Sequence, residues 1–365
     1  MEDGRMLAPE QLADLYKRHR KDPVLSIYLD ADQQDFAERG KWRIALKTAV
    51  SEQREKATDA GQFDQAFGYL NEPLEESDGS FLSGRGWVGF ATPDGVLHSE
   101  SLPVPMPNLV RWEDGLRVAP YARALKQARP VIAVVIDSRK ARILRYRMGL
   151  LSQRDFLEAD TFLGDLTDVH VAKVPTNHSG IRGKTSSDAA QKFLDVERER
   201  LVGRVVDDVR QEVGNEGLLV MGGAERTVDA LARELGDFAA NRRRILHSLN
   251  FDMSDTRLTE AVESAASEIS AEISGQLLDH LVGEARSGGD ACLGDAETER
   301  ALVEARVDTL LIADSFRRSD PDRADHFEGA AFEHGAKVVE VSRDVADRLR
   351  SEGGGVGALL RYRVG

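Results

Sequence analysis

Residues Val171 to Ser187, VAKVPTNHSGIRGKTSS, contain the residue types that bind phosphate. This basic segment holds Lys173, His178, Arg182 and Lys184 and no acidic residue, although the whole chain carries a formal net charge of -14. Lys and Arg neutralise phosphate oxygens, and a histidine stacks on a base or donates a hydrogen bond. The basic segment therefore predicts an RNA contact. The alternative is an ordinary surface loop.

A second group of cations lies a short distance upstream. Arg139, Lys140, Arg142, Arg145 and Arg147 place five cations in nine residues. Alternate residues of a strand share a face, so Arg145 and Arg147 would extend a basic stripe. We expect Arg139, Lys140 and Arg142 to bind RNA. The alternative, of equal weight, is a solvated edge strand on which cations discourage aggregation.

Other reactive residue types lack the spacing that catalysis or metal binding requires. Cys292 is the only cysteine, and none of the eight histidines stands in an H-E-x-x-H pattern, so no zinc motif is present. Gly222-Gly223 lacks the following Lys and Ser/Thr of a phosphate-binding loop and predicts a strand-to-helix turn. Asp137 likewise predicts a turn, and Arg242–Arg244 either a basic patch or a helix end. We expect no metal and no cofactor.

The cations must be positioned by the elements around them. Residues 131–147, VIAVVIDSRKARILRYR, read as a β-hairpin, and residues 188–213 as a long amphipathic helix. Its apolar stripe contains the four valines Val202, Val206, Val209 and Val213. A buried strand at 218–221 and a helix at 227–238 complete this central part.

The parts before and after it mix helices and strands. We expect helices at 9–19 and 35–56 and strands at 23–29, 86–91 and 96–101 in the first part. The last part begins with a helix of about 30 residues after Asp255. Ala301, Leu302, Ala305 and Val307 then stand at helical spacing. Strands are expected at 309–313, 337–341 and 357–363, and this β/α alternation is typical of a layered sandwich.

Composition limits the class of protein. A chain of 365 residues is long enough for two or three domains. Its acidic balance disfavours nonspecific coating of nucleic acid, so local basic patches must carry any RNA binding. The single cysteine fits a reducing cytosol, and no stretch has the ~18 apolar residues of a membrane helix. We expect a soluble, cytoplasmic protein that does not bind membranes.

From about Ala128 to Gly365 the chain resembles the archaeo-eukaryotic class-1 release factor and Pelota superfamily in its bacterial branch. The family's central domain has a hairpin similar to VIAVVIDSRKARIL and a long helix similar to AAQKFLDVERERLVGRVVDDV. Its terminal domain, of the ribosomal L7Ae type, is similar to CLGDAETERALVEARVDTLLIA and GVGALLRYRV. The fold expected is α/β with three domains. These are a mixed α/β domain at 1–126, a release-factor-like domain at 127–254 and an L7Ae-like α/β/α sandwich at 255–365.

The chain departs from the family at two motifs. Release factors carry Gly-Gly-Gln at the start of the long helix, where this chain has Ser186, Ser187 and Asp188. The carboxylate of Asp188 only accepts hydrogen bonds, whereas a glutamine amide donates and accepts. Asp188 with Gln191 instead predicts a helix N-cap. The codon-reading Asn-Ile-Lys-Ser motif is also absent from the first third.

The resemblance implies a ribosome-binding translation factor without peptidyl-tRNA hydrolase activity, similar to Pelota and to the bacterial hibernation factor Balon. It would occupy the ribosomal A site as a monomer, contact rRNA, and act in hibernation or stalled-ribosome handling, with an elongation-factor-type GTPase as a candidate second partner. One alternative is a hydrolase with a diverged loop that uses Ser186, Ser187 or Gln191. Another is an L7Ae-like RNA-binding module that acts away from ribosomes.

Overall fold

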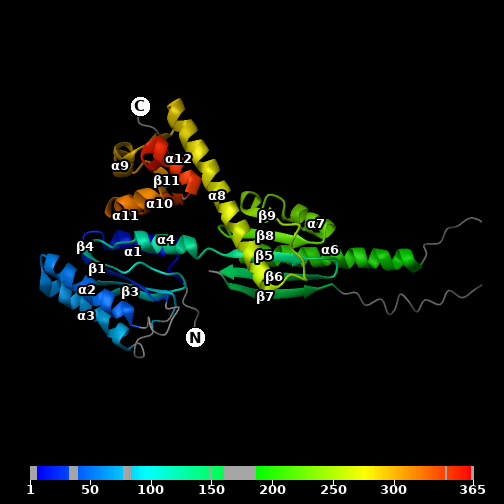
Figure 1. Ribbon diagram of the computed structural model, residues 1–365, viewed down its shortest axis with the longest axis horizontal. Helices are drawn as coiled ribbons and strands as arrows, with labels where there is room; N and C mark the ends of the chain where they lie inside the picture. The colour runs from blue at the N-terminus through cyan, green and yellow to red at the C-terminus, as the bar shows by residue number, and fades with distance from the viewer. Residues whose placement is uncertain are drawn as a thin grey trace, which may run out of the picture. The chain divides into compact units, whose positions relative to one another are not determined.

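The computed structural model describes residues 6–32, 40–76, 82, 84–147, 150–159, 186–341 and 343–362. They form two compact units (Figure 1). The paired unit joins the chain up to Ala128 with the chain from Ser274 onward, and the central unit is Arg129–Ile273. The α/β class and the three-part architecture are confirmed, because three separate sheets each carry their own helices. The domain limits given above stay a prediction.

The first sheet of the paired unit is antiparallel, in the order β3-β2-β1-β4. Its strands are β1 (Pro23–Asp30), β2 (Gly86–Thr92), β3 (Gly95–Leu102) and β4 (Leu109–Asp114). Alternation along β1 sends Leu25 and Ile27 to one face, where they pack with residues of α2 (Lys41–Lys56) and α3 (Ala60–Glu76). Tyr28 points to the other face, where its hydroxyl meets the Arg117 backbone just before α4 (Ala119–Gln127). The helix α1 (Pro9–Arg18) precedes this sheet.

The central unit is built on a five-stranded sheet in the order β7-β6-β5-β8-β9. The strands are β5 (Val131–Ile136), β6 (Lys140–Arg147), β7 (Leu150–Glu158), β8 (Leu218–Gly223) and β9 (Arg243–Ile245). β5 and β6 form the predicted hairpin, whereas β5, β8 and β9 run parallel. The helices α6 (Ser186–Val213) and α7 (Glu225–Leu235) cover one face of the sheet. The first turns of α8 (Asp255–Ser287) cover the other.

The last sheet has the order β10-β13-β11-β12. Its strands are β10 (Ala291–Leu293), β11 (Val307–Ala313), β12 (Lys337–Val341) and β13 (Val356–Leu360). α9 (Asp295–Val303) and α11 (Pro321–Glu333) pack on one face. The end of α8 and α12 (Arg343–Gly353) pack on the other, and the short α10 (Asp314–Ser319) follows β11. The predicted layered α/β/α sandwich is therefore confirmed.

Several details of the prediction need correction. Ala305 and Val307 do not continue the helix that contains Ala301 and Leu302, because α9 ends at Val303. Ala305 adopts a left-handed φ of 56°, and its N–H donates to the Leu302 carbonyl, which turns the chain into β11. The elements α3, β4 and β7 were not predicted at all.

Candidate functional site

The basic segment joins β7 to α6 in the central unit. Lys173, His178, Arg182 and Lys184 lie outside the described residues, so their RNA contact stays a prediction. Only the last two residues of the segment are placed, because α6 begins at Ser186, whereas the chain before the segment is described up to Ala159. Asp188 is therefore in the first turn of α6 and does not precede it, so its assignment as the N-cap is wrong.

The turn between β5 and β6 lies beside the end of β7. Asp137 Oδ1 accepts hydrogen bonds from the backbone N–H groups of Arg139 and Lys140, at 2.7 and 2.9 Å. The predicted turn role of Asp137 is confirmed. The Arg139 carbonyl accepts from the Ala159 N–H at 2.7 Å, and the Arg139 side chain is exposed. Arg139 is thus next to Ala159, which follows the last residue of β7.

Lys140 and Arg142 lie on the face of β6 that α8 covers. The Lys140 ammonium stands 4.4 Å from the ring centroid of Phe251, a cation–π contact. Arg142 Nη2 lies 3.5 Å from Asp255 Oδ1, a long contact to a carboxylate that is itself largely exposed. Such an ion pair contributes little to stability, so Asp255 does not hold the Arg142 guanidinium against a stronger anion.

Arg145 and Arg147 do not extend one stripe with these residues. Arg145 pairs with Glu212 of α6 at 2.6 Å, on the opposite face from Arg142, while Arg147 is exposed. Arg154 of β7 also approaches Glu212, at 3.5 Å. The cations of the hairpin therefore divide between two faces of the sheet, and Arg145 has a structural partner.

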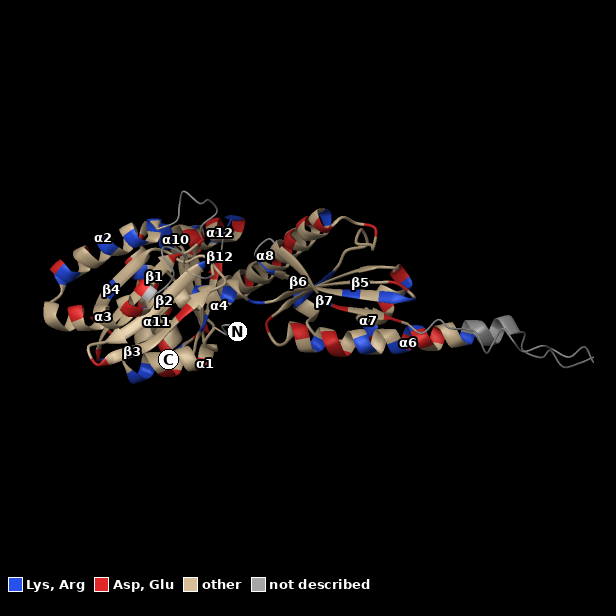
Figure 2. Cartoon of the chain, turned by 90° about the horizontal axis from the view of Figure 1, so that it is seen from below, with Lys and Arg blue, Asp and Glu red and all other residues tan. Residues whose placement is uncertain are grey.

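The helix α6 is longer than the sheet that it covers. Its core contacts begin at Leu201 and continue through Val202, Val205, Val209 and Val213. Ser186 and Leu201 are 15 residues apart, about 22 Å of helix at 1.5 Å per residue. The amino-terminal half of α6 thus runs past the strands (Figures 1 and 2). It carries the end of the basic segment away from the core.

The last two residues of β8 are glycines that neighbouring atoms approach closely. Gly223 has φ of +123°, and a Cβ added there would lie 1.9 Å from the carbonyl oxygen of Ile136. At Gly222 the added atom would meet Leu249 Cβ at 2.4 Å. The pair therefore ends β8 directly before the predicted turn into α7, at Ala224, and close packing explains why both residues are glycine.

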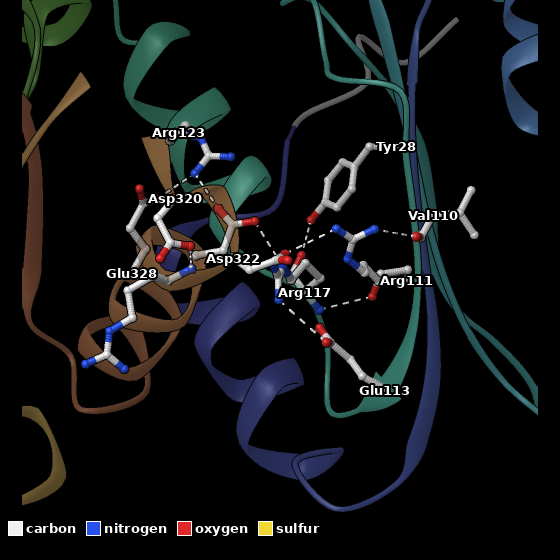
Figure 3. A network of polar contacts seen from close by, with 12 residues as sticks. Tyr28, Val110, Arg111, Glu113, Arg117, Arg123, Asp320, Asp322 and Glu328 are labelled. Atoms are coloured by element: carbon white, nitrogen blue, oxygen red, sulfur yellow. Dashed lines mark hydrogen bonds and ion pairs between the residues drawn. The ribbon is translucent and has the colours of Figure 1, made fainter. Parts of the chain in front are cut away.

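A network of charged side chains joins the two parts of the paired unit (Figure 3). Arg117 contacts Asp325 at 3.0 Å and Asp322 at 2.9 Å. Arg123 of α4 contacts both Asp325 and Glu328 of α11 at 2.9 Å. Burial, opposed in part by Arg123, raises the pKa of the Glu328 carboxyl to about 7. We call this set of five residues the clasp. Sequence reasoning missed it, because its partners are about 200 residues apart in the chain.

A cleft of about 460 Å³ lies beside the clasp in the paired unit. Its apolar wall includes Pro105, Met106 and Leu109. Four arginines line the cleft, and each forms an ion pair with a carboxylate of the chain. They are Arg111, Arg123, Arg317 and Arg318. The cleft therefore presents no uncompensated charge to a ligand.

The described residues contain no group of three or more metal-ligating side chains close enough to hold an ion. Cys292 is half-buried in β10, where burial raises the pKa of its thiol, as for a packed rather than a nucleophilic cysteine. None of the helices described is both long and apolar enough to cross a bilayer.

Comparisons with known proteins find likenesses only among solved structures. No family model and no curated protein matches the chain. Dom34 from S. cerevisiae, described as a translation termination-like factor that interacts with Hbs1, has 13% identity and a TM-score of 0.47, covering 66% of this chain and 68% of its own. Pelota from Archaeoglobus fulgidus has 15% identity and a TM-score of 0.35, covering 98% and 93%. Archaeal Pelota in a model of its ribosome-bound state with ABCE1 has 15% identity and a TM-score of 0.45, covering 98% and 95%.

Proposed function

We propose that this protein is a ribosome-binding translation factor of the release-factor and Pelota type, from the bacterial branch that includes Balon. It occupies the A site during hibernation or stalled-ribosome handling and contacts rRNA. It acts in the cytoplasm as a monomer. An elongation-factor-type GTPase is its candidate second partner.

The observation that carries the proposal is the projecting half of α6. The basic segment leads directly into the amino terminus of this helix, about 22 Å beyond the first core contact at Leu201. A stiff helix positions a segment more closely than a long free loop does. The amino end of a helix also carries a partial positive charge, which adds to the cations of the segment. The arrangement suits insertion of a basic tip into a narrow RNA-lined site.

Binding would depend on local charge because the chain as a whole repels RNA. The net charge of -14 opposes nonspecific association with phosphates. Arg139 is exposed beside Ala159 at the end of β7, and its charge would add to that of the basic segment in binding phosphates. The family resemblance further implies that the N-terminal part faces the small subunit and the last part faces the stalk base.

The proposed mechanism is occupancy rather than hydrolysis. The glutamine amide that positions water in release factors has no counterpart at Ser186, Ser187 and Asp188. Bound in the A site, the factor would exclude tRNA and other factors without attacking the ester of peptidyl-tRNA.

Co-sedimentation with vacant 70S ribosomes tests the proposal. We expect the purified chain to pellet with ribosomes and the variant Arg182→Glu/Lys184→Glu to lose most of this binding, because two phosphate contacts become repulsive. The matched control is Arg226→Glu/Arg257→Glu, two exposed arginines in the same unit with no ion pair among the described residues. Equal pelleting of the loop variant and the wild type would remove the role of the segment.

Two further measurements separate the alternatives. Cryo-EM of the pellet locates the factor, and density outside the A site would contradict the proposal. Release of peptide from ribosomes loaded with peptidyl-tRNA would support the diverged hydrolase instead. Tight binding to a kinked RNA with no binding to ribosomes would favour the L7Ae-like module.

A further inference from the structure

Three parallel strands of the central unit begin at the same edge of its sheet (Figure 1). Val131 of β5 lies opposite Leu218 of β8, and Leu219 lies opposite Arg243 of β9. The residues just before these strands therefore gather at one edge. They include Arg129 before β5 and Arg242 before β9.

Each of these two guanidinium groups is held by an uncharged acceptor. Arg129 Nη2 donates to Ser270 Oγ at 2.7 Å, and this hydroxyl donates onward to the Ala266 carbonyl at 2.8 Å. Arg242 Nη1 donates to the carbonyl of Gly217, the residue before β8. The serine hydroxyl and the glycine carbonyl therefore fix the direction of both side chains while leaving most of their N–H donors unused.

Neither arginine has a carboxylate partner among the residues described. The acid whose charge acts on both is Glu216, which is exposed and, within the described part of the chain, forms no hydrogen bond or ion pair with either of them. Both arginines are only half-exposed. Two cations that are partly removed from water and close enough to repel each other are unfavourable without a counter-ion.

The contrast with the other arginines supports this view. Carboxylates raise the pKa of each of five other arginines, Arg54, Arg85, Arg117, Arg123 and Arg323. Burial instead lowers the pKa of Arg129 and of Arg242, and the charge of Glu216 offsets this only in part, while Arg242 lowers the pKa of Arg129 further. The edge of the central sheet is thus a place where positive charge is compensated only in part.

We propose that Arg129 and Arg242 form an oxyanion site that binds a phosphate group. The planar forks of the two guanidinium groups match phosphate oxygens, and a phosphate carries the charge that both groups lack. Glu216 is the one carboxylate whose charge acts on both groups, and it forms no ion pair with either of them among the described residues. The phosphate belongs either to an RNA backbone, in which case the site rests on the proposed function, or to a free phosphate ion.

Thermal unfolding of the full chain in sodium phosphate tests the site, with sodium chloride added to hold the ionic strength constant. A bound ion raises the Tm in proportion to RT ln(1 + [L]/Kd), so we expect the Tm of the wild type to rise with phosphate. Arg129→Gln/Arg242→Gln should weaken phosphate binding at least ~10-fold and flatten this response. Arg226→Gln/Arg257→Gln, which alters two exposed arginines of the same unit, should respond as the wild type does.

A wild type that does not respond to phosphate, or a double glutamine variant that responds equally, would overturn the proposal. If the glutamine variant does not fold, Arg129→Lys/Arg242→Lys takes its place. Lysine keeps the charges but loses the forks, so the expected result is again a weaker phosphate response, and an unchanged response would count against the site.

The source of the phosphate is decided on ribosomes. Loss of co-sedimentation in the glutamine variant, with the basic segment intact, identifies an RNA backbone phosphate. Normal co-sedimentation with a lost phosphate response identifies the free ion. A wild type that responds to phosphate but does not pellet with ribosomes keeps the site and refutes the proposed function, so the two failures are distinguishable.

Discussion

The buried carboxyl of Glu328 makes the stability of the paired unit depend on pH. Its pKa is raised to about 7 in the folded chain, mainly by burial, from an ordinary value of 4.5. The folded state therefore binds more protons than the unfolded state between these values. The stabilisation of the folded chain that comes from protonated Glu328 is complete below about pH 4.5, and it is lost as the pH rises through 7.

We predict that Glu328→Gln removes this dependence of the free energy of unfolding on pH. The free energy of unfolding of the wild type should fall between pH 5 and pH 8, and that of the variant should not show this fall. At 1.36 kcal/mol per pKa unit, the difference between the two proteins is at most about 3 kcal/mol. Urea unfolding at the two pH values measures it. Asp322 does not interfere, because its hydrogen bond from Arg111 lowers its pKa below 3.8. Parallel pH profiles for the two proteins would contradict the assignment.

At Gly223 the central sheet leaves no room for a side chain. Gly223→Ala would place a methyl group 1.9 Å from the Ile136 carbonyl oxygen, so we expect a loss of stability of roughly 2 kcal/mol or more. Gly214→Ala is the matched control. Its φ is also positive, at +56°, but no atom lies within 4 Å of the added carbon, so about 1 kcal/mol is expected from backbone strain alone. Equal losses of Tm in the two variants would show that the contact between the added methyl group and the Ile136 carbonyl oxygen does not destabilise the chain.

At the scale of elements, the projecting half of α6 should be needed for binding but not for folding. Val196 is exposed and lies before the first core contact at Leu201. Proline there breaks the helix, because it removes an N–H and clashes with the preceding turn. We predict that Val196→Pro weakens ribosome binding about tenfold, or 1.4 kcal/mol, while the Tm changes little. Val196→Ala should bind normally, and full binding by the proline variant would show that the helix does not position the segment.

The elements that were predicted from the sequence are those with strong periodicity. The hairpin of β5 and β6 and the long helices α6 and α8 follow directly from alternation or from the apolar stripe. β7 was missed because, as an exposed edge strand, it has no apolar face to produce alternation. The end of α9 was missed because Ala305 takes the left-handed turn that glycine usually signals.

The site was less predictable than the fold. Clusters of Lys and Arg are visible in a sequence, but their counter-charges are not. Glu212 neutralises Arg145 from 67 positions away, and Ser270 positions Arg129 from 141 positions away. Only the folded chain shows which cations are compensated, and so which ones remain for a ligand.

At the scale of the whole molecule, the clasp should hold the two parts of the paired unit together. At pH 8, where Glu328 is largely ionised, we predict that Arg123→Gln destabilises the chain by about 3–5 kcal/mol, since it leaves the buried Glu328 carboxylate without its arginine and Asp325 with Arg117 alone. Adding Glu328→Gln should recover part of this loss. Chemical denaturation of both single variants and the double variant measures the coupling, and strictly additive effects would exclude it.

The paired unit contains both ends of the chain, and this arrangement fixes an order of biosynthesis. The ribosome completes Arg129–Ile273 before it makes α11, so the central unit has all its residues while the first sheet still lacks its partner. Arg117 and Arg123 remain without Asp325 and Glu328 until the last third of the chain has emerged. A nascent chain therefore has its whole projecting helix α6 before the first sheet can be joined to α11, and these two arginines stay open to misassembly during its own translation.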